Sequence, residues 1–332
     1  MAKSARRRLC RRLLLGAAAL VIFCLAWFAI GRLTAPIRAV RLFTPPGTPT
    51  AERAFRGRLR IATYNIAHGR GTADSNWTGE SREVRLERLR QIAALLKEQN
   101  LDVVIVNEVD FDTIWSGDVN QAQFLAREAG FGFVAEQRNL DASIPFVSLR
   151  IGNALLSRYP ITEATLVDFE GHTAWETVLA GKKRGLLCKV RLGTSRTVRF
   201  LATHLEHRGR RTRIASARKI EAVRAADPLP LVVAGDLNSS LANLPAARGD
   251  PRGQTALSVL LAGGGFRTLP DATPRAEGLT FSTLKPRSVI DWILVPVNWR
   301  IVSRTVIDTK LSDHRPVVME VQIGGAPASQ PG

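Results

Sequence analysis

The chain has 332 residues, 45% of them hydrophobic and 23% charged, which is the composition of an ordinary globular protein with a sizeable core. The formal net charge of +18 is unevenly spread, because residues 1–60 contain 13 basic side chains and one acidic side chain, Glu52. The rest of the chain is only modestly basic, which fits an anionic substrate and excludes the basic stripe of a dedicated DNA-binding protein.

An apolar segment near the N-terminus predicts a membrane anchor. Residues 1–12 carry six cations, and Leu13–Ile30 follow without any charged side chain. As a helix, this segment would span about 27 Å, close to the hydrocarbon thickness of a bilayer. The cations predict that residues 1–12 stay in the cytoplasm and that the body lies outside it, periplasmic or extracellular, in a single-pass protein of the cell membrane.

A cleaved signal peptide and a buried core helix are the other interpretations of this segment. The apolar stretch is long for a cleaved signal, and no convincing small-residue cleavage site follows it, although cleavage stays open as an alternative. A core helix would not be apolar on every face directly after six cations. We therefore expect residues 13–30 to form an uncleaved transmembrane signal anchor.

Residues 31–57 are expected to be a Pro-rich linker, because they contain four prolines and show no hydrophobic period. The ordered body is expected over residues 58–323. The last residues, 324–332, read GGAPASQPG and are expected to be a disordered tail. No protein partner is predicted.

The first half of the body alternates between strand and helix patterns. An apolar strand is expected over residues 58–67, followed by a helix within residues 78–100, where apolar side chains recur with a helical period. Residues 101–110, LDVVIVNEVD, form a β-branched run that is typical of a strand buried on both faces. A short helix over 121–129 and a strand over 131–137 follow.

The second half is richer in strands. Amphipathic helices are expected over residues 210–226 and 255–265. Strand composition occurs in six runs, which are residues 153–161, 184–192, 198–205, 229–238, 288–296 and 315–323. Many strands with a few interspersed helices favour two packed sheets with helices outside them.

Polar side chains collect at the carboxyl ends of these buried runs, where parallel strands would bring them to one edge. They are Asn65, Glu108, His204, Asp236 and Asn238, and they are joined by Asp291 within a strand and by Asp313 and His314 in the loop before the last strand. Four carboxylates placed together need a compensating cation or proton. Because oxygen donors dominate and no cysteine is available, the cation should be Mg²⁺ or Mn²⁺, with Ca²⁺ as an alternative. Each residue alone has a simpler interpretation, such as a turn at Asp236 or a helix cap at Glu108.

The ordered set of motifs resembles the endonuclease/exonuclease/phosphatase superfamily, which includes DNase I-like enzymes. The matching motifs are TYN at 63–65, NE at 107–108, GNALLSRYPI at 152–161, THL at 203–205, GDLN at 235–238, IDWILV at 290–295 and SDH at 312–314. The resemblance covers residues 58–323. It implies a DNase I-like four-layer α/β/β/α sandwich, a catalytic domain of the same extent, and divalent-metal-dependent hydrolysis of phosphoesters.

The resemblance also implies roles for the acidic and amide side chains. Glu108 would bind the main metal ion with Asn65 close by, and Asp313 would complete the metal site. Asp236 would orient or deprotonate the attacking water, and Asn238 would hold the phosphate.

For the basic side chains, the resemblance implies that His204 donates to a phosphate oxygen or to the leaving group. His314 would contact the phosphate, with its ring oriented by Asp291. Arg184 and Asn153 would lie on the substrate side. The remaining histidines, His68, His172 and His207, are expected to be bystanders, and the tryptophans, including Trp115, Trp175 and Trp292, are expected to serve in packing.

The sequence thus predicts a membrane-tethered, metal-dependent phosphodiesterase or phosphatase whose substrate is a nucleic acid, a phospholipid headgroup or a small phosphoester. One alternative is an endonuclease or exonuclease that acts on extracellular DNA or RNA. Another, of a different class, is a non-catalytic binding module with an inherited fold, and the intact acidic residues argue against it.

Overall fold

The computed structural model describes residues 2–49, 53–169, 177, 181–194, 196–241, 253–272 and 274–324. A 7-stranded sheet has the order β1-β4-β5-β3-β2-β13-β12, and a 6-stranded sheet has the order β10-β11-β9-β8-β7-β6. The larger sheet contains β1 (Val40–Phe43), β4 (Phe133–Ile144), β5 (Val147–Ser157), β3 (Val103–Asp110), β2 (Arg58–Asn65), β13 (Val317–Gln322) and β12 (Arg300–Val306). The smaller sheet contains β10 (Phe266–Arg267), β11 (Asp291–Pro296), β9 (Leu231–Asp236), β8 (Arg196–His204), β7 (Arg184–Leu192) and β6 (Ile161–Asp168).

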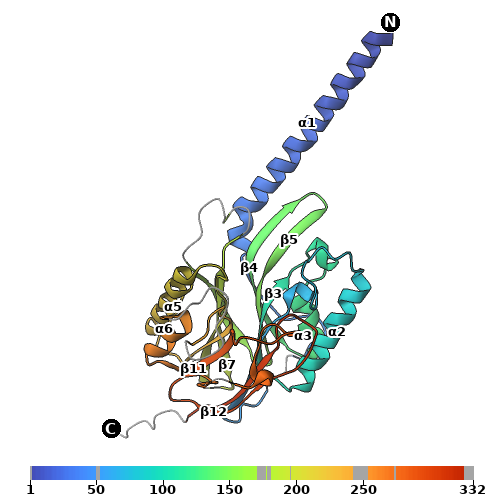
Figure 1. Cartoon of the computed structure of the whole chain (residues 1–332). Helices are drawn as coiled ribbons and strands as arrows, with labels where there is room; N and C mark the ends of the chain where they lie inside the picture. Colours follow the sequence, from blue (N-terminus) through green and yellow to red (C-terminus); the bar gives the residue numbers. More distant parts are fainter. Residues whose placement is uncertain are drawn as a thin grey trace.

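Helices cover the outer faces of the two sheets (Figure 1). The larger sheet carries α2 (Arg82–Glu98) and α3 (Gln121–Ala129), and the smaller sheet carries α5 (Arg210–Ala225) and α6 (Ala256–Ala262). In the described connections, short 3-10 helices occur at η1 (Ala35–Arg38), η2 (Ala67–Gly69), η3 (Ile114–Ser116) and η4 (Ala276–Gly278). The expected α/β/β/α sandwich is therefore confirmed.

The core consists of three apolar layers. The central layer lies between the sheets and joins residues such as Ile61 and Ile105 of the larger sheet to Phe200 and Ile293 of the smaller one. The other two layers lie between each sheet and its helices. Because both faces of β3 are covered, its sequence VVIVNEVD does not alternate between apolar and polar residues.

Helix α2 shows how the local sequence specifies the fold. Its buried residues include Leu89, Ile92 and Leu96, whose spacing of three and four residues places them on one face. The helix begins after Ser81, whose side chain accepts a hydrogen bond from the Val84 N–H and so satisfies one of the free donors of the first turn. The expected helix within residues 78–100 is thus confirmed.

Two parallel strand pairs bring the polar strand ends together. β2 pairs with β3 in parallel, with Asn65 opposite Asn107, and β8 pairs with β9 in parallel, with His204 opposite Asp236. The carboxyl ends of the strands in each pair therefore lie at the same edge of their sheet. This edge is the one at which the sequence predicts a site.

The structure also contains strands that were not expected. Residues 40–43, part of the expected linker, form β1 and pair with β4. The strand expected over 131–137 continues as β4 to Ile144 and forms a long hairpin with β5. β12 was not expected either, because its exposed face makes RIVSRTV mostly polar. The expectations for His172, Trp175 and residues 325–332 lie outside the described residues.

Helix α1 (Ala2–Thr34) projects away from the sandwich (Figure 1). The segment Arg6–Ile37 is long and apolar enough to cross a membrane, and its most apolar window is not buried against the rest of the protein. A membrane anchor and a signal sequence both have these properties. In either case, α1 contributes nothing to the core of the sandwich.

Candidate active site

The carboxylate of Glu108 is turned into the site by a backbone irregularity. The register between β3 and β5 shifts between Asn107 and Val109, so Glu108 is the extra residue of a β-bulge. Its φ of 51° is in the left-handed region, which a non-glycine residue adopts only when the surrounding structure holds it there. Bulges re-aim side chains next to active sites.

Cationic groups surround this carboxylate. Glu108 Oε2 lies 3.3 Å from His68 Nε2 and 3.5 Å from Arg70 Nη1, and Glu108 Oε1 accepts a hydrogen bond from Asn65 Nδ2 at 3.1 Å. Burial by itself would raise the pKa of Glu108, but the positive charges of His68 and Lys183 outweigh it and hold this pKa well below its usual range. The carboxylate is therefore ionised and available to a cation.

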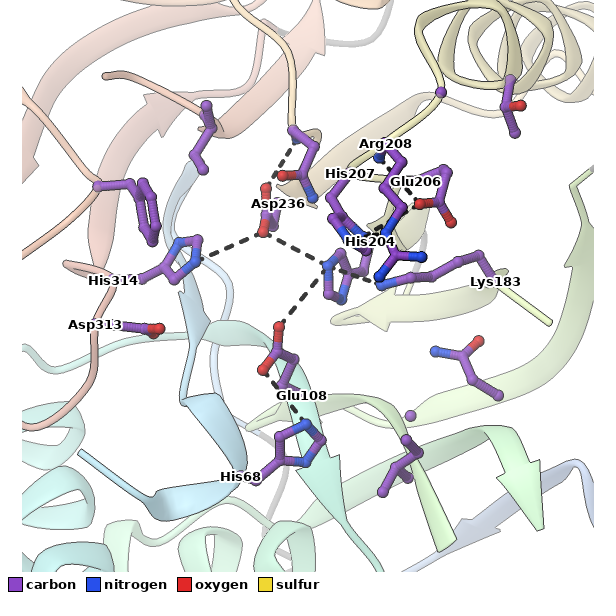
Figure 2. Close-up of a pocket in the computed structure, with 18 of the residues that line it drawn as sticks. His68, Glu108, Lys183, His204, Glu206, His207, Arg208, Asp236, Asp313 and His314 are labelled. Atoms are coloured by element: carbon purple, nitrogen blue, oxygen red, sulfur yellow. Dashed lines mark hydrogen bonds and ion pairs between the residues drawn. The ribbon is translucent and has the colours of Figure 1, made fainter. Parts of the chain in front are cut away.

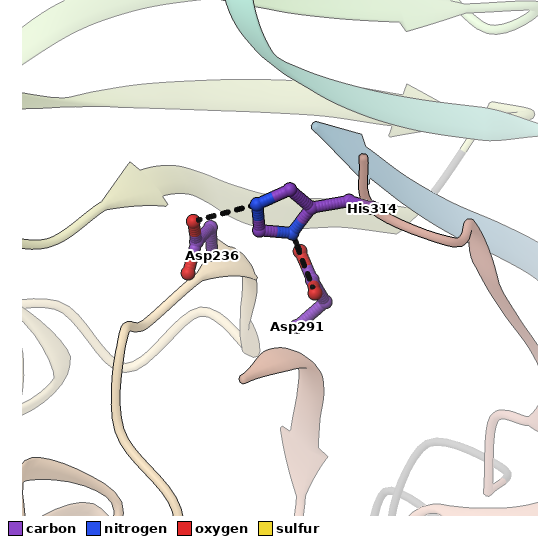
Figure 3. A group of neighbouring side chains, drawn as sticks. All are labelled: Asp236, Asp291 and His314. Carbon is purple, nitrogen blue, oxygen red and sulfur yellow. Dashed lines mark hydrogen bonds and ion pairs between the residues drawn. The ribbon is translucent and has the colours of Figure 1, made fainter. Parts of the chain in front are cut away.

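His314 lies between two buried carboxylates (Figure 3). Its Nδ1 is 3.0 Å from Asp291 Oδ2, and its Nε2 is 3.7 Å from Asp236 Oδ2. Burial opposes the charged ring, but Asp291, by its charge and its hydrogen bond, and Asp236 raise the pKa of His314 to about 10. The ring is an imidazolium with a fixed orientation, and the Phe281 ring packs against it at a centroid distance of 4.7 Å.

Asp236 is a buried carboxylate at the end of β9. Burial raises the pKa of Asp236 to about 7, against the lowering effect of the His314 charge. Its Oδ1 accepts from the Asn238 backbone N–H at 2.8 Å, and its Oδ2 accepts from Asn65 Nδ2 at 3.3 Å. A carboxylate with a pKa near neutrality has the properties of a general base.

On the opposite wall, Lys183 contacts His204. The distance between Lys183 Nζ and His204 Nε2 is 2.9 Å, and His204 Nε2 is also 3.6 Å from Asp236 Oδ2. Burial and the Lys183 charge lower the pKa of His204 well below its usual value, so the ring is neutral and accepts the hydrogen bond from the ammonium group. Burial lowers the pKa of Lys183 too, against the raising charges of Glu108 and Asp236, and we assign the positive charge on this wall to Lys183 and not to His204.

Asn107 ties the strand ends of both sheets to one another. Its Nδ2 donates to Thr203 O at 2.9 Å and to Asn153 Oδ1 at 2.8 Å, and its Oδ1 accepts from the Asp236 N–H at 3.0 Å. The close approach also requires Gly235, because a Cβ there would lie 1.8 Å from Thr203 O. One buried amide thus fixes β3, β5, β8 and β9 relative to each other.

The SDH segment is held against the end of β2. Ser312 is fully buried, and its Oγ donates to Asn65 O at 2.8 Å. Its neighbour Asp313 accepts a hydrogen bond at Oδ2 from Arg70 Nη2 at 2.9 Å. The Arg70 guanidinium therefore lies between the carboxylates of Glu108 and Asp313.

These side chains surround a cavity of about 1130 Å³. Six of the predicted site residues line it, which are Glu108, His204, Asp236, Asn238, Asp313 and His314 (Figure 2). Asn65 and Asp291 lie behind this wall, where they orient Glu108 and His314. The Asn65 Oδ1 accepts a hydrogen bond from the Ala67 N–H, so the NH₂ group of this amide faces the carboxylates. Asn65 therefore donates hydrogen bonds to them and offers no oxygen to a metal.

Two predicted substrate-binding residues do not line the cavity. Arg184 Nε donates to Asp168 Oδ1 at 2.9 Å, and Asn153 is fully buried between Gln137 and Asn107. The structure corrects both expectations, because strand alternation turns the Arg184 side chain away and presents Lys183 in its place. Asn153 supports Asn107 and does not face the substrate side.

His68 corrects a further expectation, since it is no bystander. Its Nδ1 is 2.7 Å from Asp110 Oδ1, and its Nε2 faces Glu108. Trp115 donates from Nε1 to Asp110 Oδ2 at 2.8 Å and packs on the edge of the His68 ring, so its expected packing role is confirmed. Burial opposes the charged form, but Asp110 raises the pKa of His68 above its usual value.

Of the other aromatic and histidine residues, Trp292 is fully buried in the core, as expected. His207 lies at the rim of the cavity, where its side chain is half exposed and contacts Glu206 at 3.1 Å. Arg70 and Lys183 have no sequence signal of their own. His68 could have been found, because Asp110 follows Glu108 by two residues and supplies a buried partner for an imidazole near Asn65.

Two groups of side chains could hold a cation. In the described part of the chain, Asp236, Asp291 and His314 offer three ligand atoms within 4.8 Å of one another. However, both ring nitrogens of the His314 imidazolium face carboxylates, so this ring has no free lone pair for a metal. The carboxylates of Glu108 and Asp313 fit better, because a cationic guanidinium already lies between them and hard oxygen donors suit Mg²⁺ or Mn²⁺.

The model of the Endonuclease/Exonuclease/phosphatase family matches residues 62–314, so the chain belongs to this family. Comparison with curated proteins gives no match. Among solved structures, an endonuclease/exonuclease/phosphatase from Beutenbergia cavernae DSM 12333 is similar at 23% identity and a TM-score of 0.60, covering 82% of this chain and 74% of that one. One from Bacteroides vulgatus has 18% identity and a TM-score of 0.61, covering 81% and 100%.

The mannosyl-6-phosphatase Bt3783 of Bacteroides thetaiotaomicron VPI-5482 is also similar, at 15% identity and a TM-score of 0.57, covering 79% of this chain and 99% of that chain. At these identities the structures establish the fold that the chain shares with them. The reaction has to be argued from the side chains of this chain.

Proposed function

We propose that this chain is a divalent-metal-dependent phosphoester hydrolase, tethered by α1 with its body outside the cytoplasm. The observation that carries the proposal is that the carboxylates of Glu108, Asp313 and Asp236 and the His314 imidazolium all line a single cavity. A hard cation and a general base next to fixed positive charge are the groups that phosphoester hydrolysis needs.

Glu108 and Asp313 would hold the metal ion, with Asn65 fixing the Glu108 carboxylate by its hydrogen bond. When bound, the ion would supply charge neutralisation on the phosphate and activation of water. Arg70, which now contacts both carboxylates, would have to move aside from them. Mg²⁺ and Mn²⁺ both suit this set of oxygen donors.

Asp236 would accept the proton of the attacking water, because its carboxyl is deprotonated above neutral pH and is held by Asn65 and the Asn238 N–H. His314 would donate from Nε2 to a phosphate oxygen while Asp291 keeps Nδ1 protonated. These fixed donors stabilise the negative charge that develops in the transition state.

On the other wall, the Lys183 ammonium, which is hydrogen-bonded to His204, would supply positive charge to the phosphate or to the leaving group. The role expected for His204, donation to a phosphate oxygen or to the leaving group, would thus be shared by Lys183 and His204. Asn238 lines the cavity, and its Nδ2 donates to Leu205 O. Its side-chain oxygen would therefore face the cavity. The substrate class is a phosphoester that can enter a cavity of about 1130 Å³.

The test is hydrolysis of bis(p-nitrophenyl) phosphate and p-nitrophenyl phosphate by the purified full-length chain in detergent. We expect release of nitrophenol with Mg²⁺ or Mn²⁺, none with EDTA, and recovery when the metal is restored. The ratio of the two rates distinguishes a diesterase from a monoesterase. A chain that binds phosphate but hydrolyses neither ester with any divalent metal would instead be a binding module.

The orientation has a separate test, which rests on the cations before Leu13. Protease added to cells with a permeabilised outer envelope and an intact inner membrane should digest the body. A body that is protected until the membrane is dissolved would place the site in the cytoplasm. Recovery of the undigested body in the soluble fraction would indicate that residues 13–30 are a cleaved signal.

A further inference from the structure

The β4–β5 hairpin extends from the same edge of the larger sheet as the candidate site. In the pairing of β3 with β5, Asp110 lies opposite Ile151, so the carboxyl end of β3 is level with Ile151. Beyond that level, β4 and β5 form ladder pairs with each other as far as Ile144 and Val147, and Arg150 of β5 is also hydrogen-bonded to Phe111 and Thr113. Asn139, Ile151 and Gly152 at the base of this hairpin line the cavity.

Helix α1 joins the sandwich at this edge too. Arg32 Nη1 donates to Asp141 O of β4 at 2.8 Å, and a Cβ on Gly31 would lie 3.5 Å from Ser143 Oγ. The last residues of the apolar segment are therefore beside residues 141–143 of the hairpin. Figure 1 shows the hairpin projecting from the sandwich on the side from which α1 leaves.

The tip of the hairpin is apolar and exposed. Residues 142–149, ASIPFVSL, contain no charged side chain, whereas Asp141 and Arg150 flank them. Phe146 is 102% exposed and Ile144 is 41% exposed. Single exposed apolar side chains are common, but an exposed apolar patch on a projecting element marks a contact with a protein or a membrane.

We propose that this tip, Ile144–Val147, is a second contact with the bilayer that α1 crosses, and that the two contacts hold the catalytic edge of the sandwich toward the membrane surface. The occupant is the lipid bilayer because the tip lies beside the end of the apolar helix segment and is apolar itself. Aromatic side chains favour the boundary between headgroups and acyl chains.

The contact has a consequence for the substrate, and this part rests on the proposed function. Ile144 is five residue steps along β4 from Asn139 at the cavity wall. At about 3.3 Å per step, the cavity wall lies about 17 Å from the tip. The site would thus act on phosphoester groups just above the headgroup layer. The hairpin contact itself requires no catalytic activity.

The experiment places an environment-sensitive fluorophore on single cysteines of the full-length chain in liposomes, after Cys10 and Cys24 are replaced by alanine. Cys188 is buried and is left in place. The test position is Phe146→Cys. The matched control is Val297→Cys, an apolar residue, 54% exposed, in the turn after β11 at the opposite edge of the sandwich.

We expect lipids with a quencher at the headgroup boundary to reduce the emission of the Phe146→Cys label several-fold and to leave the Val297→Cys label unchanged. Equal and weak quenching at both positions would overturn the proposal, as would quenching that the Ile144→Asp substitution does not reduce. Hydrolysis of p-nitrophenyl phosphate is measured on the same samples. Its absence would count against the proposed function only, because the quenching result does not depend on catalysis.

Discussion

Glu108 combines a left-handed backbone with an ionised, partly exposed carboxylate, and each depends on contacts from other parts of the chain. The Glu108→Gln substitution keeps the size of the side chain and removes the charge. We expect activity to fall at least about 100-fold, since even the neighbours of metal ligands contribute 10- to 100-fold. The apparent affinity for Mg²⁺ should fall with it, as measured by activity against metal concentration.

The control for this substitution is Glu98→Gln at the end of α2, far from the cavity. It should change neither rate nor metal dependence. The fold of Glu108→Gln should survive, but its thermal unfolding should begin at a lower temperature than that of the parent chain, because the amide leaves the charges of His68 and Arg70 without their carboxylate partner. A variant that keeps the parent's metal dependence would remove Glu108 from the metal site.

Asp236 and His314 face each other across 3.7 Å and should act as one unit. Asp236→Asn removes the basic oxygen, and the loss of a positioned general base costs about 10²–10⁴-fold in rate. His314→Ala removes the donor to the phosphate and should cost a comparable factor. The fold-loss of rate in the double variant should be much smaller than the product of the two single fold-losses. Independent, multiplying losses would show that the two residues do not share a step.

The pH dependence of the rate follows from the same pair. The pKa of Asp236 is raised to about 7, and only its deprotonated form can accept a proton from water. At limiting Mg²⁺, kcat/KM should therefore rise as the pH increases through about 7. Saturating Mg²⁺ adds positive charge nearby and should move this rise to lower pH, because it stabilises the carboxylate. A rate that does not vary between pH 5 and 8 at either concentration would contradict the assignment of Asp236.

The side chains at strand ends were predictable from the sequence, because a buried apolar run that stops at a polar residue marks the point where the strand leaves the core. Glu108 and Asp236 were found in this way, whereas His314 was found from the SDH motif that precedes β13. Lys183 was missed in favour of its neighbour Arg184, since one residue of strand register decides which of the two faces the cavity. His68 was missed because its role depends on Asp110, a contact across two strands that periodicity does not reveal.

At the scale of secondary structure, helices with a regular apolar period and strands buried on both faces were predicted with the correct type. β1 and β12 lie at the two edges of the larger sheet and are largely exposed, so their sequences lack such a pattern. Beyond Asn139, β4 forms ladder pairs with β5 alone among the described strands, and few side chains of this part of the hairpin are buried. Buried positions create the apolar pattern that predicts a strand, and β1, β12 and the hairpin have few of them.

Gly235 in β9 allows a prediction at this scale. Gly235→Ala would place a Cβ 1.8 Å from Thr203 O at a φ of +144°, so β8 and β9 would have to separate where Asn107 joins the sheets. We expect a loss of stability of about 3 kcal/mol or more, combining overpacking with backbone strain. Thermal unfolding in detergent measures it.

The control for Gly235→Ala is Gly264→Ala, where φ is +67° and no atom lies near the added Cβ. This substitution has the cost of the left-handed backbone alone, about 1 kcal/mol. Equal destabilisation by both substitutions would show that the contact with Thr203 does not limit β9.

At the scale of the whole molecule, two sheets with independent outer layers meet at a single polar edge. The smaller sheet supplies Asp236, His204 and Asp291, and the larger sheet supplies Glu108 and Asn65. The metal-binding carboxylate and the general base therefore come from opposite halves of the sandwich. Their distance is fixed by the central apolar layer and by the Asn107 amide.

The connection between α1 and the sandwich is short, since η1 occupies Ala35–Arg38 and β1 begins at Val40. With so little chain between them, the body cannot swing freely above a membrane that holds α1. Encounters with substrate would then be counted per unit area of membrane instead of per unit volume of solution. Lengthening this connection by a flexible segment would leave hydrolysis of a dissolved ester unchanged and would lower the rate on an ester fixed to the same vesicle, because the site would spend most of its time facing elsewhere.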